Sequence, residues 1–94
     1  MGQEFSSPRP NVIVGSSFSV EVLGQTGLLY AEGNRSIRID SEVLAEPRHI
    51  ALYRESITRW QQPTLEPVGF QDADRVIANV RRALESSGYV LQVI

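Results

Sequence analysis

The stretch RESITRWQQPTLEPVGFQDADRVIANVRRALESSGYVLQVI, residues 54–94, decides the fold, because it contains a proline-marked turn, one well-defined helix and a closing apolar strand. The helix is predicted over residues 72–87, where apolar residues recur with the period of one helical face. This stripe consists of Val76, Ile77, Val80 and Leu84, widened by Ala73 and Ala83. A helix with a single apolar stripe must cover another layer, so the pattern predicts a helix packed on a sheet.

Charges and a glycine mark the ends of this helix. Asp72 and Asp74 lie in the first turn, and Arg81 and Arg82 lie toward the end, so both signs complement the helix dipole. Gly88 follows as a residue that commonly ends helices. Residues 89–94 then read as an apolar strand, which we expect to pair centrally in the sheet.

Working back toward the N-terminus, alternation of apolar and polar residues predicts further strands. They are joined by short turns, of which Gly33 and Asn34 form the tightest, so the middle of the chain should be an antiparallel meander. The predicted strands before the helix cover residues 12–14 (as an edge strand), 17–23, 28–32, 35–40 and 48–53. Residues 41–47 fit either a helical turn or a strand extension, which Pro47 ends.

These elements predict one α+β domain over residues 12–94, with two layers: an antiparallel sheet of about five strands and one long helix packed on one face. Residues 1–11 are rich in serine and proline and lack an apolar period, so we expect a flexible N-terminal tail. Trp60 lies in a segment interrupted by prolines, which we expect to fold back over the sheet.

The composition limits the classes of function. The chain of 94 residues is 41% hydrophobic and 21% charged, as in ordinary globular domains, with a net charge of −2. Its arginines are dispersed rather than gathered into a basic stripe, so a nucleic-acid partner is not expected. No apolar run is long enough to span a bilayer, and residues 1–10 do not resemble a secretory signal, so we predict a cytoplasmic protein without membrane contact.

Catalytic and metal-binding patterns are weak in this sequence. His49 stands mid-strand without a motif around it, and the chain has no cysteine, which argues against a zinc site. Asp72 and Asp74 are two residues apart at a helix start, where capping and dipole complementation explain them better than acid–base chemistry. The glycine-rich turns match no phosphate-binding fingerprint. We therefore predict that the protein is not an enzyme and has no catalytic residue, cofactor or metal.

Acidic residues and one tryptophan are the candidate partner-binding residues. Residues 1–47 carry six acidic residues against three arginines, and four of those acids are expected to cluster along the later strands of the meander and the following turn. These four are Glu32, Asp40, Glu42 and Glu46. The alternative is an ordinary solvated face. Trp60 has two interpretations as well, either a core residue that seals one end of the sheet or an exposed interface anchor.

Two segments resemble the bacterial immunity protein 74 family of polymorphic toxin systems. They read LLYAEGNRSIRIDSEVL (residues 28–44) and IALYRESITRWQQPTLEPVGFQDADRVIANVRRALESSGYVLQVI (residues 50–94), and the likeness extends from about Phe18 onward. The matching features are a glutamate near the end of the third strand, a Ser-Ile-x-x-Trp-x-x-Pro segment, an acidic-started helix and a terminal strand. They fall on Glu42, Ser56, Ile57, Trp60, Pro63, Ile77, Asn79 and residues 89–94. The chain departs from the pattern at Gln61, where the family places an acid.

This resemblance implies a small non-enzymatic protein that binds a cognate bacterial toxin domain and neutralises it. The alternative is a small structural or regulatory protein-interaction domain, and a homo-oligomer is compatible with either function. If the resemblance holds, the change at Gln61 alters any toxin contact made at that position.

Overall fold

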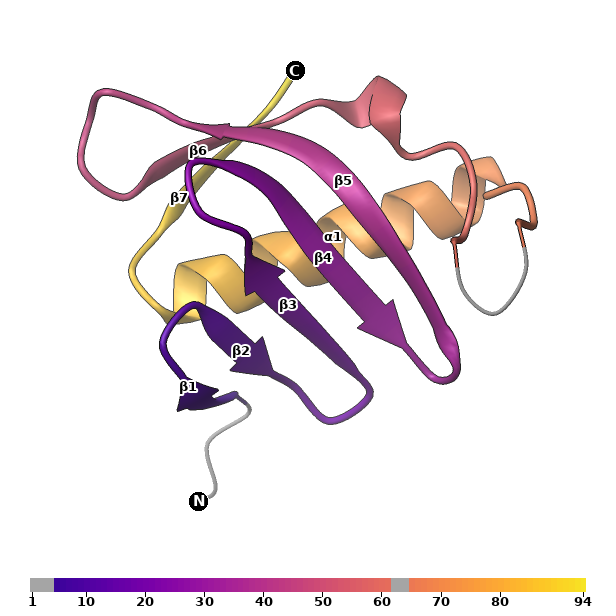
Figure 1. Ribbon diagram of the computed structural model, residues 1–94, viewed down its shortest axis with the longest axis horizontal. Helices are drawn as coiled ribbons and strands as arrows, with labels where there is room; N and C mark the ends of the chain where they lie inside the picture. The colour runs from indigo at the N-terminus through magenta and orange to yellow at the C-terminus, as the bar shows by residue number, and fades with distance from the viewer. Residues whose placement is uncertain (1–4, 62–64) are drawn as a thin grey trace.

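A computed structural model describes residues 5–61 and 65–94 and shows one curled, mostly antiparallel sheet of seven strands with one helix packed on it (Figure 1). The strands follow one another across the sheet in chain order. They are β1 (Ser6–Arg9), β2 (Val12–Val14), β3 (Phe18–Val22), β4 (Thr26–Glu32), β5 (Arg35–Val43), β6 (His49–Leu52) and β7 (Val90–Val93). A short 3-10 helix, η1 (Arg54–Ser56), and the helix α1 (Phe70–Ser86) connect β6 to β7.

The predicted meander is confirmed in β3, β4 and β5. Phe18, Val20 and Val22 are buried on the side of β3 that faces the helix, as their alternation predicts. Gly33 adopts a positive φ of 55° in the turn between β4 and β5, a conformation that glycine accepts readily. The ambiguous residues after 40 extend β5 as far as Val43.

Four expectations about the sheet are wrong. The sheet has seven strands rather than about five, and one of them, β1, lies in residues that were expected to form a tail. Ser6–Arg9 forms β1 and pairs with β2, although the sequence predicts a flexible tail there, and β2 consequently does not lie at the edge. The strand after the helix, β7, is an edge strand parallel to β6 rather than a central one.

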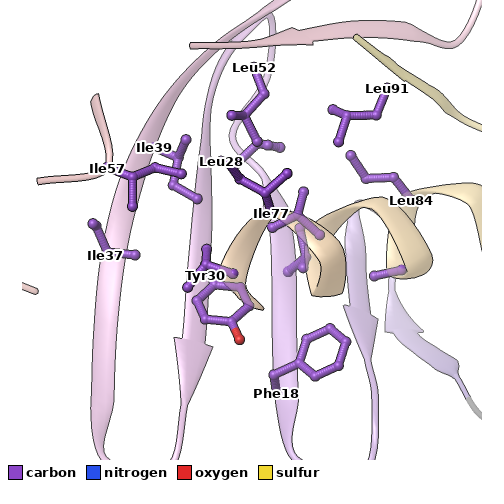
Figure 2. Close-up of a cluster of buried hydrophobic side chains, with 14 of the residues drawn as sticks. Phe18, Leu28, Tyr30, Ile37, Ile39, Leu52, Ile57, Ile77, Leu84 and Leu91 are labelled. Atoms are coloured by element: carbon purple, nitrogen blue, oxygen red, sulfur yellow. The ribbon is translucent and has the colours of Figure 1, made fainter. Parts of the chain in front are cut away.

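The helix fills the concave side of the sheet, and the core lies between them (Figure 2). Its predicted stripe is confirmed, because Val76, Val80 and Leu84 are fully buried. Across from the helix, Leu28 and Ile39 project from neighbouring strands into the same core. The opposite, convex face of the sheet carries no helix in the described part of the chain (Figure 1).

The C-terminal end of α1 is held by a side chain from the loop before β6. Arg48 donates hydrogen bonds to the carbonyls of Ser87 and Gly88, the two residues that follow the helix. Its guanidinium also lies 4.2 Å from the centre of the Tyr89 ring. Gly88 has a φ of 85°, as expected for the residue that ends the helix.

Candidate partner-binding surface

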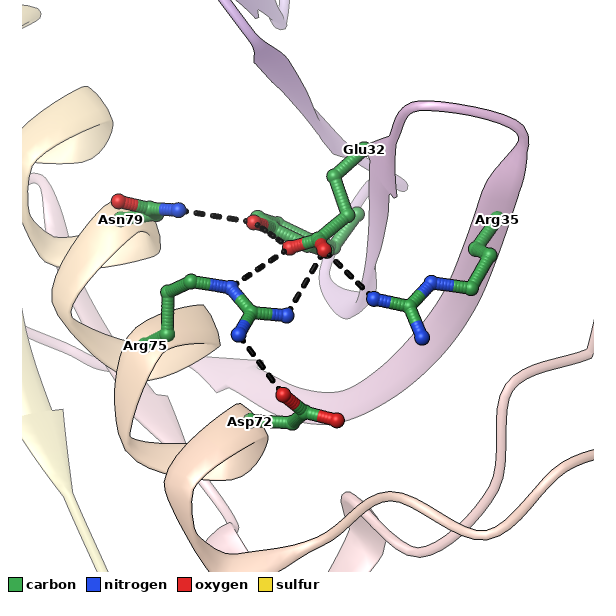
Figure 3. Close-up of polar contacts among 6 residues, drawn as sticks. Glu32, Arg35, Asp72, Arg75 and Asn79 are labelled. Atoms are coloured by element: carbon green, nitrogen blue, oxygen red, sulfur yellow. Dashed lines mark hydrogen bonds and ion pairs between the residues drawn. The ribbon is translucent and has the colours of Figure 1, made fainter.

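Glu32 lies at the end of β4, where it joins the sheet to the helix (Figure 3). Its carboxylate accepts hydrogen bonds from the Tyr30 hydroxyl at 2.7 Å and from Arg35 at 2.9 Å. Arg75 of α1 binds both carboxylate oxygens, with Nη2 at 2.8 Å and Nε at 3.3 Å. Because three side chains donate hydrogen bonds to this carboxylate, Glu32 has a structural role that links the sheet to the helix.

The network continues along the helix on both sides of Arg75. Arg75 Nη1 donates to Asp72 at 2.7 Å, one turn earlier, and the Asn79 side chain donates to the Tyr30 hydroxyl at 2.9 Å, one turn later. Figure 3 shows the contact between Arg75 and Asp72. Asn79 and Asp72 therefore have a direct structural role in fixing α1 over the β4–β5 hairpin.

Burial and hydrogen bonding act in opposite directions on Glu32. Burial alone raises the pKa of its carboxyl, but the hydrogen bonds from Arg75, Tyr30 and Arg35 outweigh this and hold the pKa below its ordinary value. Burial raises the pKa of the Tyr30 hydroxyl, and its hydrogen bond to the Glu32 carboxylate acts in the same direction. Glu32 is therefore ionised and Tyr30 neutral across the physiological range.

The expectation that four acidic residues cluster is wrong for Glu32. It pairs with Arg35 at one end of the β4–β5 hairpin, whereas Glu42 pairs with Thr26 at the other end. The side chain of Glu32 is only 16% exposed, and two arginines neutralise it. The remaining acids, Asp40, Glu42 and Glu46, define what we call the acidic surface.

The acidic surface lies at the far end of β5 and in the turn that follows. Asp40 and Glu42 alternate with buried Ile39 and Ser41, so both project from the convex face. The side chain of Asp40 is 64% exposed and that of Glu46 in the following turn is 74% exposed. All three carboxylates can therefore meet a partner.

Each acid of this surface has a local partner. Arg38 lies 3.0 Å from Asp40, the Tyr53 hydroxyl donates to Glu42 at 3.1 Å, and His49 Nε2 is 3.5 Å from Glu46. The hydrogen bond to Glu42 and its negative charge raise the pKa of Tyr53. Exposed pairs of this kind contribute little to stability. A cationic group of a partner could therefore replace the local neighbour of each carboxylate at a small cost in free energy.

Trp60 is a core residue in this structure. Its indole is buried, with its centre 6.4 Å from that of the Tyr30 ring, and the Arg35 guanidinium lies 4.2 Å from its ring centre. The indole Nε1 has no hydrogen-bond partner within the described residues. The structure therefore places Trp60 in the first of its two predicted settings, away from the surface.

The segment around Trp60 covers an otherwise open edge of β5. Gln61 donates its N–H to the Ser36 carbonyl at 2.8 Å, and its side-chain oxygen accepts the Arg38 N–H at 3.0 Å. The Ser56 hydroxyl accepts the Asp40 N–H at 2.9 Å. Gln61, the departure from the resembled family, thus has a structural role, while Pro63 of that motif lies outside the described residues.

The described residues contain no group of three or more histidine, cysteine or acidic side chains that could hold a metal ion. His49 contacts the Pro47 carbonyl through Nδ1 at 3.0 Å, besides its contact with Glu46. Neither contact aligns it with a nucleophile. Asp74 pairs with Arg54 of η1, which is a structural contact between helix and loop.

A hollow of about 620 Å³ lies between β1 and the C-terminal end of α1. Its lining includes Phe5, Ile13, Arg82 and Glu85. Sequence reasoning missed it, because it depends on β1, which was expected to be a tail. It groups no set of residues suited to nucleophilic or acid–base catalysis.

Comparisons with protein-family models, with curated proteins and with solved structures found no match for this chain. Within residues 5–61 and 65–94, no helix is long and apolar enough to cross a membrane.

Proposed function

We propose that this protein is a non-enzymatic immunity protein that binds a cognate bacterial toxin domain and neutralises it in the cytoplasm. The observation that carries the proposal is the acidic surface, because three exposed carboxylates project from β5 and the turn that follows it, on and beside a sheet face that no described helix covers. The sequence resemblance to immunity proteins supports the same function. In this arrangement the helix and core serve as a rigid support for the sheet face.

Charge complementarity gives the acidic surface a defined role. Toxins that attack nucleic acids need basic surfaces to hold phosphates, and an inhibitor that covers such a surface gains from clustered carboxylates. Exposed charges also accelerate encounter by long-range attraction. The acidic surface would thus set the rate and orientation of binding. The Trp60 segment would fix the shape of β5, from which Asp40 and Glu42 project.

The second candidate is a small structural or regulatory protein-interaction domain. Its support is the set of exposed large apolar side chains, because Phe70 at the start of α1 is almost fully exposed and Leu65 lies nearby in sequence, also exposed. Exposed aromatic residues are enriched at interfaces. Genome neighbourhood separates the two candidates, since an immunity gene is expected directly downstream of a gene that encodes a toxin domain.

The direct test is co-expression in bacteria of this chain with the toxin domain encoded beside its gene. We expect the chain to restore growth and the two proteins to co-purify as a complex. A D40R/E42R variant that folds normally should protect less well, whereas E85R, a charge reversal at an exposed position on α1, should protect as well as the unmodified chain. Growth arrest in the presence of the folded, unmodified chain would contradict the proposal.

A further inference from the structure

The edge of the sheet formed by β7 carries unpaired backbone groups. Val90 and Ile94 donate their N–H groups to Arg48 and Leu52, on the β6 side. Since these groups alternate along a strand, the N–H and C=O groups of Leu91 and Val93 point away from β6. No strand of the described chain lies on that side, because β7 is last in the sheet order.

The two edges of the sheet differ in how they are protected. At the other edge, β1 contains Pro8, which lacks an N–H, and its pairing with β2 shifts register. Proline and irregular pairing are common devices against edge-to-edge association. The sequence of β7, Val-Leu-Gln-Val, contains no proline, glycine or charge. Arg81 donates to the Leu91 carbonyl at 3.2 Å, but a carbonyl has a second lone pair.

The exposed side chains at the end of the chain match those of a second copy that is related by a two-fold axis. Val90 is 47% exposed and Ile94 is 63% exposed, and both lie on the same face as Gln92. In an antiparallel pair centred on Gln92, Val90 of one copy lies opposite Ile94 of the other. The same register places Leu91 opposite Val93, so that their outward N–H and C=O groups form hydrogen-bonded pairs. The hydrogen-bonding pattern of the backbone and the matching of the exposed side chains therefore favour the same register.

We propose that two copies of this chain associate through β7, in an antiparallel pair centred on Gln92 that joins their sheets. The interface is isologous, so the same residues serve both partners. A single strand pair buries less area than a standard interface, so the dimer is weak and concentration-dependent. The acidic surface is formed by β5 and the turn that follows it, and β6 lies between β5 and β7, so the proposed dimer interface does not use the three carboxylates of the acidic surface.

Charge placement across the axis tests this register. In a V90K/I94K variant, a lysine of one copy lies opposite a lysine of the other at both exposed positions. In V90K/I94E, a lysine lies opposite a glutamate at the same two positions. Sedimentation equilibrium from about 10 µM to about 1 mM, a range suited to a weak interface, should show the unmodified 10.5 kDa chain approaching twice its mass. We expect V90K/I94K to associate at least about tenfold more weakly, an effect of about 1.4 kcal/mol, and V90K/I94E to retain dimers. Circular dichroism would verify that both variants fold.

A single cysteine provides a second measure, because the chain has none of its own. Opposed residues of such a non-hydrogen-bonded pair have Cα atoms about 4.5 Å apart, within the range that a disulfide spans. Q92C should therefore form a covalent dimer under mild oxidation much faster than E85C on α1. An unmodified chain that remains monomeric throughout would overturn the proposal. So would equal loss of association in both charge variants, or equal crosslinking of Q92C and E85C.

Discussion

At the scale of single residues, the acidic side chains of this protein fall into two groups. Glu32 is partly buried and bound by Tyr30, Arg35 and Arg75, so it stabilises the contact between helix and sheet. Asp40 and Glu46 are mostly exposed, and each has one local basic neighbour. Glu32 therefore stabilises the fold, whereas Asp40 and Glu46 are exposed enough to contact a partner.

Replacing Glu32 with glutamine tests this division through pH. Because the pKa of Glu32 is lowered in the folded state, its stabilising effect is present above the ordinary carboxyl range and disappears as pH falls through the lowered value. At pH 7, E32Q should unfold more readily by about 1–3 kcal/mol, the usual cost of weakening buried hydrogen bonds to charged groups. Urea unfolding at pH 7 and at a pH below the ordinary carboxyl range should show a smaller difference at the lower pH.

The control for this measurement is E85Q, which alters an exposed carboxylate of α1. Its free energy of unfolding should stay within about 0.5 kcal/mol of the unmodified chain at both pH values. A deficit of E32Q that is the same at both pH values would mean that the charge of Glu32 does not stabilise the network.

At the scale of elements, α1 determines whether the curled sheet has a core. Val80 is fully buried at the middle of its apolar stripe, so V80D would bury an unpaired carboxyl. We expect a loss of several kcal/mol, a large fraction of the stability of a domain of this size. The matched variant A78D changes an exposed position of the same helix and should unfold at a temperature close to that of the unmodified chain. Thermal unfolding that distinguishes neither variant would contradict the packing of α1 on the sheet.

The elements that sequence predicts well are those with a clear period. The apolar stripe of α1 and the alternation in β3 and β5 identify the helix, the meander and most of the core. The prediction fails for β1 because Ser6–Arg9 has no apolar side to bury, and this strand is held by backbone pairing with β2. The edge position of β7 also escapes prediction, because partner strands and direction are set by tertiary packing.

The candidate site could be predicted from the sequence only in part. Asp40 and Glu42 share a strand, so alternation alone places them on one face. Glu32 is adjacent to them in the meander, but the hairpin carries it to the opposite end, where Arg75 from the helix binds it. A contact between residues 43 positions apart has no local sequence signal. Only the fold reveals that Glu32 is a structural residue.

At the scale of the whole molecule, one face of the sheet packs against the helix to form the core, and the other face carries no helix in the described part of the chain (Figure 1). The curled sheet and helix have a Cα radius of gyration of 12.6 Å, close to the value of about 12 Å expected for a folded chain of this length. The acidic surface lies at one end of this rigid body. We therefore expect the molecule to meet its proposed partner through fixed, exposed charges.

The kinetics of binding to the proposed toxin partner show whether the acidic surface is the binding surface. If the proposed toxin partner exists, we expect D40R/E46R to bind it with an association rate lowered at least about tenfold at low salt, and with a flatter dependence on ionic strength, because electrostatic steering is lost. Its unfolding curve should change little, and E85R should associate at the unmodified rate. If D40R/E46R associates as fast as the unmodified chain at low salt, the acidic surface is not the binding surface, which contradicts the proposed mode of binding.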